Sequence, residues 1–160
     1  MRVGVVSDTH NHLANVASLV ALFNAAAVDR VVHTGDVTQA KTLNAFAALD
    51  APLCGVYGNN DVEREALDAA CREHGYRWSE PGLELDWAGR RIVVVHDPRD
   101  VDGRAADYDL LLHGHTHRHV LERNGEVLTF NPGECAGHMS GYNAVGVVDL
   151  ATMDVELLKF

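Results

Sequence analysis

Short apolar runs alternate with helix-like apolar spacing in the first half of the chain. Three such runs predict buried strands, at residues 2–6, 30–33 and 52–56. Apolar residues three and four positions apart predict helices over residues 13–27, 40–49 and 63–74. Gly75 follows the last of these, where a helix commonly ends. This β-α-β-α-β order is typical of parallel strands joined by right-handed crossovers.

The second half of the chain consists of short apolar runs separated by turns. The predicted strands are residues 83–86, 92–96, 110–113, 119–123, 126–131, 144–150 and 154–159. Ala88-Gly89 and Asn124-Gly125 are typical of hairpin turns. Together the two halves predict an α/β (α+β) fold in which two packed mixed β-sheets form a sandwich flanked by helices. The change of pattern is gradual, so we expect one domain over residues 1–160.

Composition excludes several classes of protein. Hydrophobic residues make up 47% and charged residues 22% of the chain, the mix of a globular domain rather than of a disordered segment. The apolar stretch 16–27 is interrupted by Ser18 and Asn24 and is too short to span a bilayer. No signal-peptide pattern follows Met1, and the three cysteines lack the C-x-x-C spacing. We therefore expect a cytoplasmic protein without a membrane partner.

The formal net charge of -10 limits the partners that we expect. Duplex nucleic acids are bound through clustered Lys and Arg, and the 13 basic residues of this chain are scattered. An extended nucleic-acid surface is therefore not expected. Bound cations can reverse the sign of a local field, so an acidic enzyme can still act on a phosphate.

Polar side chains follow five of the predicted strands, at the points where those strands end. The segments are Asp8-Thr9-His10, Thr34-Gly35-Asp36, Gly58-Asn59-Asn60-Asp61, His96-Asp97 and Gly114-His115-Thr116-His117. Ligands of open α/β sheets bind beyond the carboxyl ends of the strands. We therefore expect these segments to converge on one pocket.

The converging side chains form a mixed nitrogen and oxygen ligand set. Asp8, Asp36 and Asn59 supply oxygen, and His10, His96, His115 and His117 supply imidazole nitrogen. Such a set without thiolate suits Mn, Zn, Fe, Co or Ni. Seven ligands are too many for one ion but suffice for two if one carboxylate bridges. Two ions about 3.5–4 Å apart can clamp the attacking and leaving oxygens of an in-line displacement and lower the pKa of a shared water toward about 7.

Each segment also has a purely structural interpretation. The segments that begin at Asp8 and Gly58 are compatible with turns and helix caps. His96 alone is compatible with a core histidine, and the pair after Gly114 with a histidine-rich strand edge. The structural interpretation needs a separate explanation for each of the five segments and for their order along the chain. Metal binding explains all five at once and is the favoured interpretation.

In this order the motifs resemble the signature of the calcineurin-like metallophosphoesterases. The residues that carry the resemblance are Asp8-x-His10, Gly35-Asp36, Gly58-Asn59-Asn60-Asp61, His96 and Gly114-His115-x-His117. The short length is similar to the compact bacterial and archaeal phosphodiesterase branch of that superfamily, and the resemblance extends to the turn Asn131-Pro132-Gly133. It implies the two-sheet sandwich and a metal-dependent phosphodiesterase that acts on a small phosphate ester.

The resemblance also implies a role for each ligand. Asp8, His10, Asp36 and His117 would hold a first metal, and Asp36, Asn59, His96 and His115 a second, with Asp36 bridging. A hydroxide between the two metals would attack phosphorus in line. Manganese is the expected metal, with Ni, Co, Fe and Zn as alternatives. The expected catalytic residues are Asn59, Asn60, Asp61 and His96, and Asn11 and Asn60 are expected to contact the substrate.

Three positions depart from the family pattern. Asn60 stands where many members have a histidine that protonates the leaving group, so esters with good leaving groups are expected, and Asp61 is expected to orient the loop. Asp97 replaces the usual glycine after His96, and we expect its carboxylate to face solvent rather than to support an imidazole. Glu134 replaces the serine usual in the compact branch, and an acid near the pocket would disfavour doubly charged monoesters.

Other functions use the same fold or the same residue types. A non-catalytic protein-binding module, such as one eukaryotic retromer subunit, would show substituted ligands, whereas all seven ligands here have the expected type. A nuclease acting on nucleic-acid ends needs additional DNA-binding surface, for which an acidic chain of 160 residues has little room. A binuclear amidohydrolase is usually built on a longer barrel. Exposed apolar strands would also allow a homo-oligomer, without a specific signature for one.

Overall fold

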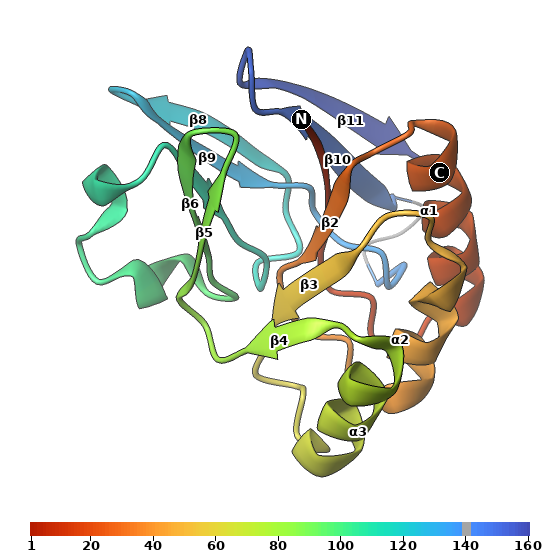
Figure 1. The fold of residues 1–160 in the computed structure, drawn as a ribbon. Helices are drawn as coiled ribbons and strands as arrows, with labels where there is room; N and C mark the ends of the chain where they lie inside the picture. The colour runs from red at the N-terminus through yellow and green to blue at the C-terminus, as the bar shows by residue number, and fades with distance from the viewer. Residues whose placement is uncertain (139–141) are drawn as a thin grey trace.

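A six-stranded sheet forms the larger layer of the fold (Figure 1). The computed structural model describes residues 1–138 and 142–160. In spatial order the strands are β11 (Asp154–Lys159), β10 (Ala144–Asp149), β1 (Arg2–Val6), β2 (Arg30–His33), β3 (Leu53–Val56) and β4 (Arg77–Ser79). Strands β1 to β4 run parallel, whereas β10 and β11 are antiparallel to their neighbours. The carboxyl ends of β1, β2 and β3 therefore meet at one edge of the sheet.

A five-stranded sheet forms the second layer. Its strands, in spatial order, are β5 (Leu83–Trp87), β6 (Arg90–Val94), β7 (Leu110–Leu112), β9 (Val127–Asn131) and β8 (Val120–Asn124). Two antiparallel hairpins, β5–β6 and β8–β9, flank β7, which runs parallel to both β6 and β9. Both sheets are thus mixed, as predicted.

Apolar side chains fill the space between the two sheets. Val5 and Val32 of the larger sheet and Ile92, Leu112 and Phe130 of the smaller sheet belong to one cluster and are inaccessible to solvent. This burial is the main stabilising contribution, because apolar surface removed from water contributes about 25 cal/mol per Å². The predicted sandwich of two packed sheets is confirmed.

Helices cover the outer face of the larger sheet (Figure 1). They are α1 (Leu13–Ala25), α2 (Ala40–Ala45), which continues as the 3-10 helix Phe46–Ala48, and α3 (Arg64–His74). In α1, Val16, Leu19, Val20 and Phe23 are buried at helical spacing and pack in one cluster with Val31 of β2. The outer face of the smaller sheet is covered by two short 3-10 helices, Pro98–Val101 and Ala105–Asp107.

The predicted elements and the observed ones differ mainly at their ends. The helix predicted over 40–49 is α-helical only to Ala45, and the strand predicted over 92–96 ends at Val94. The strand β4 was not predicted, because it has only three residues and no buried face to produce an alternating pattern. Gly75 follows α3 in the left-handed conformation (φ 70°), so the predicted helix end is confirmed.

Within residues 1–138 and 142–160, the longest helix has 13 residues, and no helix has the length and apolar character of a membrane span.

Candidate metal centre

The five predicted polar segments meet at the carboxyl ends of strands from both sheets. The segment after β1 is bonded to the segment after β2, because the amides of Asp8 and His10 donate to the carbonyls of Gly35 and Asp36, each at 3.1 Å. Within the smaller sheet, the amide of Gly114 donates to the carbonyl of His96 at 3.0 Å. The amide of His115 then donates to the Asp8 carboxylate at 3.1 Å and joins the two sheets. The predicted convergence is therefore present.

Left-handed backbone conformations are concentrated in these segments. The predicted site residues with positive φ are Asp8 (51°), His10 (40°), Asn11 (63°), Asp36 (61°), His115 (66°) and His117 (57°). Such conformations are uncommon for residues other than glycine, and they persist where surrounding contacts compensate for the strain. Sharp local turns of this kind direct successive side chains, such as His115 and His117, toward one centre.

The first predicted ligand group lies together. Single donor atoms of Asp8, His10, Asp36 and His117 are all within 4.8 Å of one another. The Asp8 Oδ2 atom accepts hydrogen bonds from the Ser7 hydroxyl and from the His115 amide. Its Oδ1 atom is buried without a hydrogen-bond partner and lies 3.4 Å from His117 Nε2 and 3.8 Å from His10 Nε2.

Buried polar atoms without hydrogen-bond partners indicate whether the first group can hold a metal ion. The His10 Nε2 atom is likewise buried without a hydrogen-bond partner. Leaving buried polar atoms unsatisfied costs about 1–3 kcal/mol each, and a cation between them would satisfy both. Carboxylate oxygen and imidazole nitrogen are ordinary ligands of first-row divalent metals. The first group therefore fits a divalent cation.

The Asp36 carboxylate lies between the two predicted ligand groups. Its Oδ2 atom is 3.4 Å from His10 Nε2 and 3.5 Å from His96 Nε2. The backbone amide of Asn60 donates to Oδ1 at 2.9 Å, and the Asn60 side-chain amide donates to Oδ2 at 2.7 Å. Burial raises the pKa of Asp36, but the contacts with His96 and Asn60 outweigh it and hold that pKa well below its usual range. Asp36 therefore lies within reach of histidines from both predicted ligand groups.

The second predicted group contains Asn59, His96 and His115. The Asn59 Oδ1 atom lies 3.0 Å from both His96 Nε2 and His115 Nδ1. The other ring nitrogen of His96, Nδ1, lies 2.9 Å from the carbonyl oxygen of Thr34 and donates a hydrogen bond to it. This contact leaves His96 Nε2 directed at Asp36 and Asn59. A carbonyl that accepts a hydrogen bond from one ring nitrogen fixes the orientation of a metal-binding histidine in this way.

Two carboxylates support the imidazoles of His115 and His117. The Glu134 side chain is fully buried, and its Oε2 atom is hydrogen-bonded to His117 Nδ1. The Asp97 Oδ2 atom lies 3.5 Å from His115 Nε2, and only 16% of the Asp97 side chain is exposed. The Asp97 carboxylate is thus only partly exposed: it accepts hydrogen bonds from the exposed Arg99 and also lies beside His115. Glu134 is buried behind His117 rather than exposed on the pocket surface, so its contact is with a predicted ligand.

Asp61 and Asn11 hold neighbouring segments in place. The Asp61 carboxylate is buried and accepts backbone hydrogen bonds from Gly58 (2.7 Å), Asp36 (3.0 Å) and Thr38 (2.6 Å). It thus holds the backbones of two loops that carry predicted ligands. The Asn11 side-chain oxygen accepts a hydrogen bond from Thr42 at 2.9 Å, so this part of Asn11 is occupied by α2.

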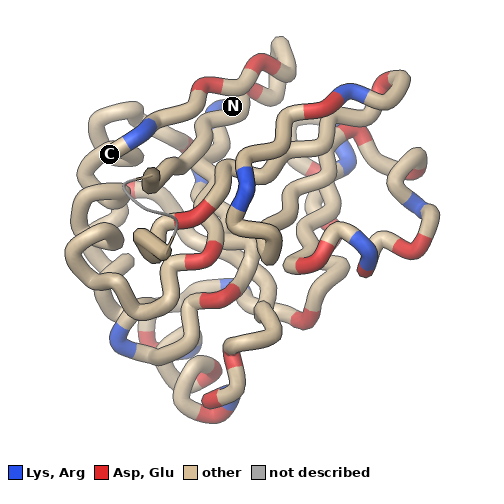
Figure 2. The backbone as a smooth tube through the Cα atoms, turned by 180° about the vertical axis from the view of Figure 1, so that it is seen from behind, with Lys and Arg blue, Asp and Glu red and all other residues tan. Residues whose placement is uncertain are grey.

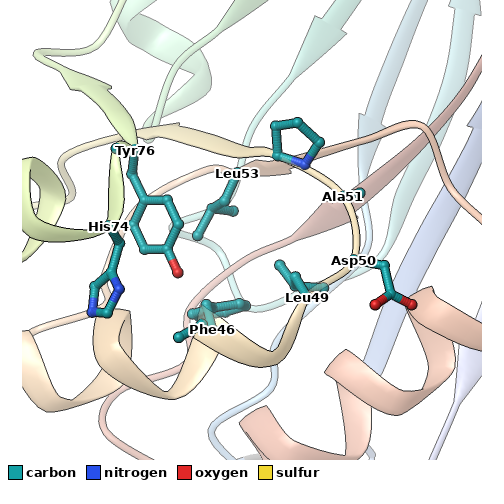
Figure 3. Close-up of a pocket in the computed structure, with 10 residues that line it drawn as sticks. Phe46, Leu49, Asp50, Ala51, Leu53, His74 and Tyr76 are labelled. Carbon is teal, nitrogen blue, oxygen red and sulfur yellow. The ribbon is translucent and has the colours of Figure 1, made fainter.

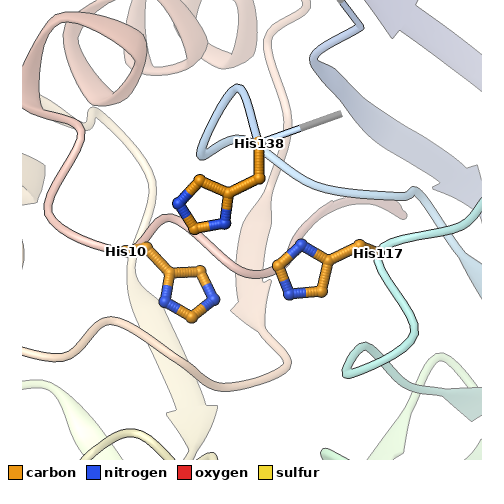
Figure 4. A group of neighbouring side chains, drawn as sticks. All are labelled: His10, His117 and His138. Atoms are coloured by element: carbon orange, nitrogen blue, oxygen red, sulfur yellow. The ribbon is translucent and has the colours of Figure 1, made fainter. Parts of the chain in front are cut away.

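A further histidine, His138, lies beside the first group and was not predicted from the sequence. Figure 4 shows the imidazoles of His10, His117 and His138 facing one another from three different segments. One ring nitrogen from each lies within 4.8 Å of those of the other two. His138 follows β9 by seven residues, in a stretch without strand or helix periodicity, so only its residue type could have indicated a role.

Gly114 permits the close approach of Asp8 to the segment after β7. A Cβ atom at this position would lie 2.0 Å from Ser7 Oγ and 2.8 Å from Asp8 Oδ2. We expect Gly114→Ala to lower the free energy of unfolding by about 1–3 kcal/mol and to weaken metal binding, because Asp8 must move. Urea denaturation and metal titration would measure both effects.

Gly125→Ala is the matched control for that substitution. A Cβ atom at Gly125 would meet nothing within 4 Å, although the backbone there is left-handed (φ 63°). We expect a cost of about 1 kcal/mol and unchanged metal binding. Metal binding by Gly114→Ala as tight as that of Gly125→Ala would contradict the role given to Gly114.

A cleft of about 520 Å³ borders the second group. Its lining includes the predicted ligands Asn59, His96 and His115 and the charged residues Arg64, Glu80, Asp97, Arg99 and Asp100. Another cavity, of about 290 Å³, lies near the amino end of β3 and is lined by residues such as Phe46, Leu53 and Tyr76 (Figure 3). It contains none of the predicted ligands and lies at the opposite end of the strand from Asn59.

Comparison with known proteins defines the class to which the fold and the ligand set belong. The family model of the calcineurin-like phosphoesterase superfamily domain matches residues 1–153. The chain belongs to this superfamily. Phosphodiesterase MJ0936 of Methanocaldococcus jannaschii is 30% identical over 154 residues, which are 93% of this chain and 93% of that protein.

Solved structures agree with this assignment. The structure of an archaeal phosphodiesterase superposes with a TM-score of 0.93 at 30% identity and covers 100% of both chains. Vps29 from Entamoeba histolytica superposes with a TM-score of 0.72 at 18% identity, over 100% of this chain and 99% of that one, which shows a shared fold alone. The family resemblance of the motifs is thus confirmed.

Proposed function

We propose that this chain is a metal-dependent phosphodiesterase that hydrolyses a small phosphate ester at a site for two divalent cations. One observation carries the proposal: Asp8 Oδ1 and His10 Nε2, both in the first ligand group, are buried without hydrogen-bond partners. The Asp36 carboxylate lies next to His10 of this group and next to His96 of the second group. Relatives called phosphodiesterases support the type of reaction, because one of them covers 93% of this chain.

The ligand set indicates which metals the site would take. Asp8, His10, Asp36 and His117 would hold one cation, and Asp36, Asn59, His96 and His115 would hold the other. Manganese, nickel, cobalt, iron and zinc all accept such mixed nitrogen and oxygen ligands. When bound, two such cations supply a water of lowered pKa and neutralise charge on the phosphate oxygens.

The surrounding residues keep the site in one arrangement. Asn60 donates two hydrogen bonds to Asp36, so the bridging carboxylate has one orientation. Asp61 holds the loops that carry Asp36 and Asn59, and Thr34 orients His96. Catalysis of phosphoryl transfer depends mainly on such positioning and on electrostatic stabilisation.

The surroundings of the site favour a small substrate. The cleft beside the second group measures about 520 Å³, and its two arginines, Arg64 and Arg99, are paired with Glu80 and Asp97 in its wall. Figure 2 shows Lys and Arg at separated places along the backbone, without a continuous basic band. Binding of an extended nucleic acid depends on such a band.

Hydrolysis of bis(p-nitrophenyl) phosphate by the purified protein would test the proposal. The protein is first stripped of metal, and Mn, Ni, Co, Zn or Mg is then added separately. We expect no turnover without metal and turnover with at least one of the first four. Bound metal should reach two ions per chain, as measured by elemental analysis.

The alternatives predict other results. A protein-binding module of the same fold would hydrolyse no ester, whether or not it binds metal. A nuclease would degrade DNA ends faster than the small diester at equal concentrations. Absence of bound metal under all conditions would overturn the proposal, because the ligand set would then have no role.

Replacement of Asn60 tests the expected preference for good leaving groups. An imidazole at this position can donate a proton to the leaving oxygen, which is worth roughly 10²–10⁴-fold. We expect Asn60→His to accelerate hydrolysis of an alkyl diester by at least about 10²-fold, while the p-nitrophenyl diester changes little. The substitution removes the side-chain bond to Asp36, so metal content is measured in parallel. An unchanged rate on the alkyl diester, with two metals bound, would contradict the preference.

A further inference from the structure

We propose that His138 is an additional metal ligand, which closes the first metal position from its exposed side and makes that position prefer nitrogen-binding cations such as zinc over manganese. This inference rests on the proposed function, because it concerns the same metal centre. None of the ligands implied by the family resemblance lies in the segment that carries His138.

The geometry of three imidazoles supports this role. The ring centroid of His138 lies 5.0 Å from that of His10 and 5.7 Å from that of His117, and the latter two lie 5.2 Å apart. A ring nitrogen of each lies within 4.8 Å of one on each of the others. Three nitrogens at such separations fit around one cation at ordinary metal–nitrogen distances of about 2.0–2.1 Å after small side-chain rotations.

His138 approaches the pair His10 and His117 from the side opposite the carboxylates. Asp8 and Asp36 are almost completely buried and form the inner wall of the first group. The side chain of His138 is 58% exposed, and those of His10 and His117 are 14% and 20% exposed. Donor atoms of His138 lie in one group with those of His10 and His117, and these two histidines form a second group with Asp8 and Asp36, so His138 would complete the first position from its exposed side.

Glu134 lies next to both His138 and the predicted ligand His117. The same Oε2 atom that is bonded to His117 Nδ1 lies 3.9 Å from His138 Nδ1. A buried carboxylate next to both imidazoles favours the orientation in which their remaining ring nitrogens face the cation.

The chemical consequence is a change in metal preference. With His138, the first position has three imidazole nitrogens and two carboxylate oxygens, whereas the second has two imidazoles, one amide oxygen and the shared Asp36. Imidazole suits zinc, iron, nickel and copper, while oxygen ligands suit manganese and magnesium. The first position is therefore the one that selects zinc or iron.

Equilibrium titration of the metal-free protein with zinc and with manganese would test the inference. Wild type, His138→Ala and the control His74→Ala are compared, because His74 is a partly buried histidine at the end of α3 and outside the ligand groups. We expect His138→Ala to lower the zinc affinity of one of the two positions by at least about tenfold, the lower end of the loss seen for outer-shell partners of metal ligands. Manganese affinity should fall less, and His74→Ala should match wild type.

Visible absorption of the cobalt-loaded protein gives a second readout that does not depend on activity. The d–d bands of cobalt report the number and type of its ligands, so the spectrum of His138→Ala should differ from those of wild type and His74→Ala. His138 is mostly exposed, so its replacement by alanine is expected to leave the fold intact, as circular dichroism would verify.

The possible failures are distinguishable. If wild type binds two cations and His138→Ala has the zinc affinity and cobalt spectrum of His74→Ala, then His138 is not a ligand, while the proposed function stands. If wild type binds no cation, the proposed function fails, and the role of His138 fails with it.

Discussion

Asp36→Asn is expected to abolish hydrolysis of bis(p-nitrophenyl) phosphate, with a loss of at least about 10³-fold in kcat/KM, because the substitution removes a buried charge from the centre of the site. The carboxylate Oδ2 lies 3.4 Å from His10 Nε2 and 3.5 Å from His96 Nε2, so it belongs to both ligand groups. An asparagine has the same shape but only one acceptor oxygen and no charge. Bound metal should fall from two ions to one or none.

Asp154→Asn is the matched control for Asp36→Asn. Asp154 is exposed at the start of β11, so its replacement removes the same charge from the chain at a distance from the ligands. We expect wild-type activity and metal content in this variant. Activity of Asp36→Asn within tenfold of that of Asp154→Asn, with two ions bound, would contradict the bridging role of Asp36.

The sequence predicted those parts of the fold and the site that depend on local pattern. Strands β1 and β2 were predicted with the observed bounds, because their apolar runs are buried on both faces. The convergence of Asp8, Asp36 and Asn59 also followed from local pattern, since the parallel strands β1, β2 and β3 place their carboxyl ends on one edge of the larger sheet. The roles of the predicted ligands remain predictions until metal binding is measured.

The parts that the sequence did not predict depend on contacts between distant segments. Asp97 supports His115 because the turn after β6 directs its carboxylate inward, which no local pattern indicates. Glu134 contacts His117, which is 17 residues away in the sequence, and His138 contacts His10, which is 128 residues away. Strand β4 pairs with β3 at the sheet edge, although its three residues carry no strand pattern.

Glu134→Ala is expected to weaken zinc binding by about 10–100-fold, because the His117 imidazole loses the carboxylate that orients it. Glu134 is fully buried and hydrogen-bonded to His117 Nδ1, whose other nitrogen lies 3.4 Å from Asp8 Oδ1. Glu134→Gln should have a smaller effect, since its amide oxygen still accepts a hydrogen bond from Nδ1 but carries no charge. Zinc titration of the metal-free variants would measure both losses.

Comparison with Asp97→Asn separates an orienting role from a general loss of negative charge. Asp97 stands 3.5 Å from His115, but its carboxylate also binds the exposed guanidinium of Arg99, which already compensates its charge. We therefore expect Asp97→Asn to weaken zinc binding less than Glu134→Gln does, although both remove one charge next to a ligand histidine. The metal-free form of Glu134→Gln should be at least as stable as wild type, because a buried carboxylate is costly to desolvate. A stable Glu134→Gln that binds zinc as tightly as wild type would show that His117 needs no carboxylate partner.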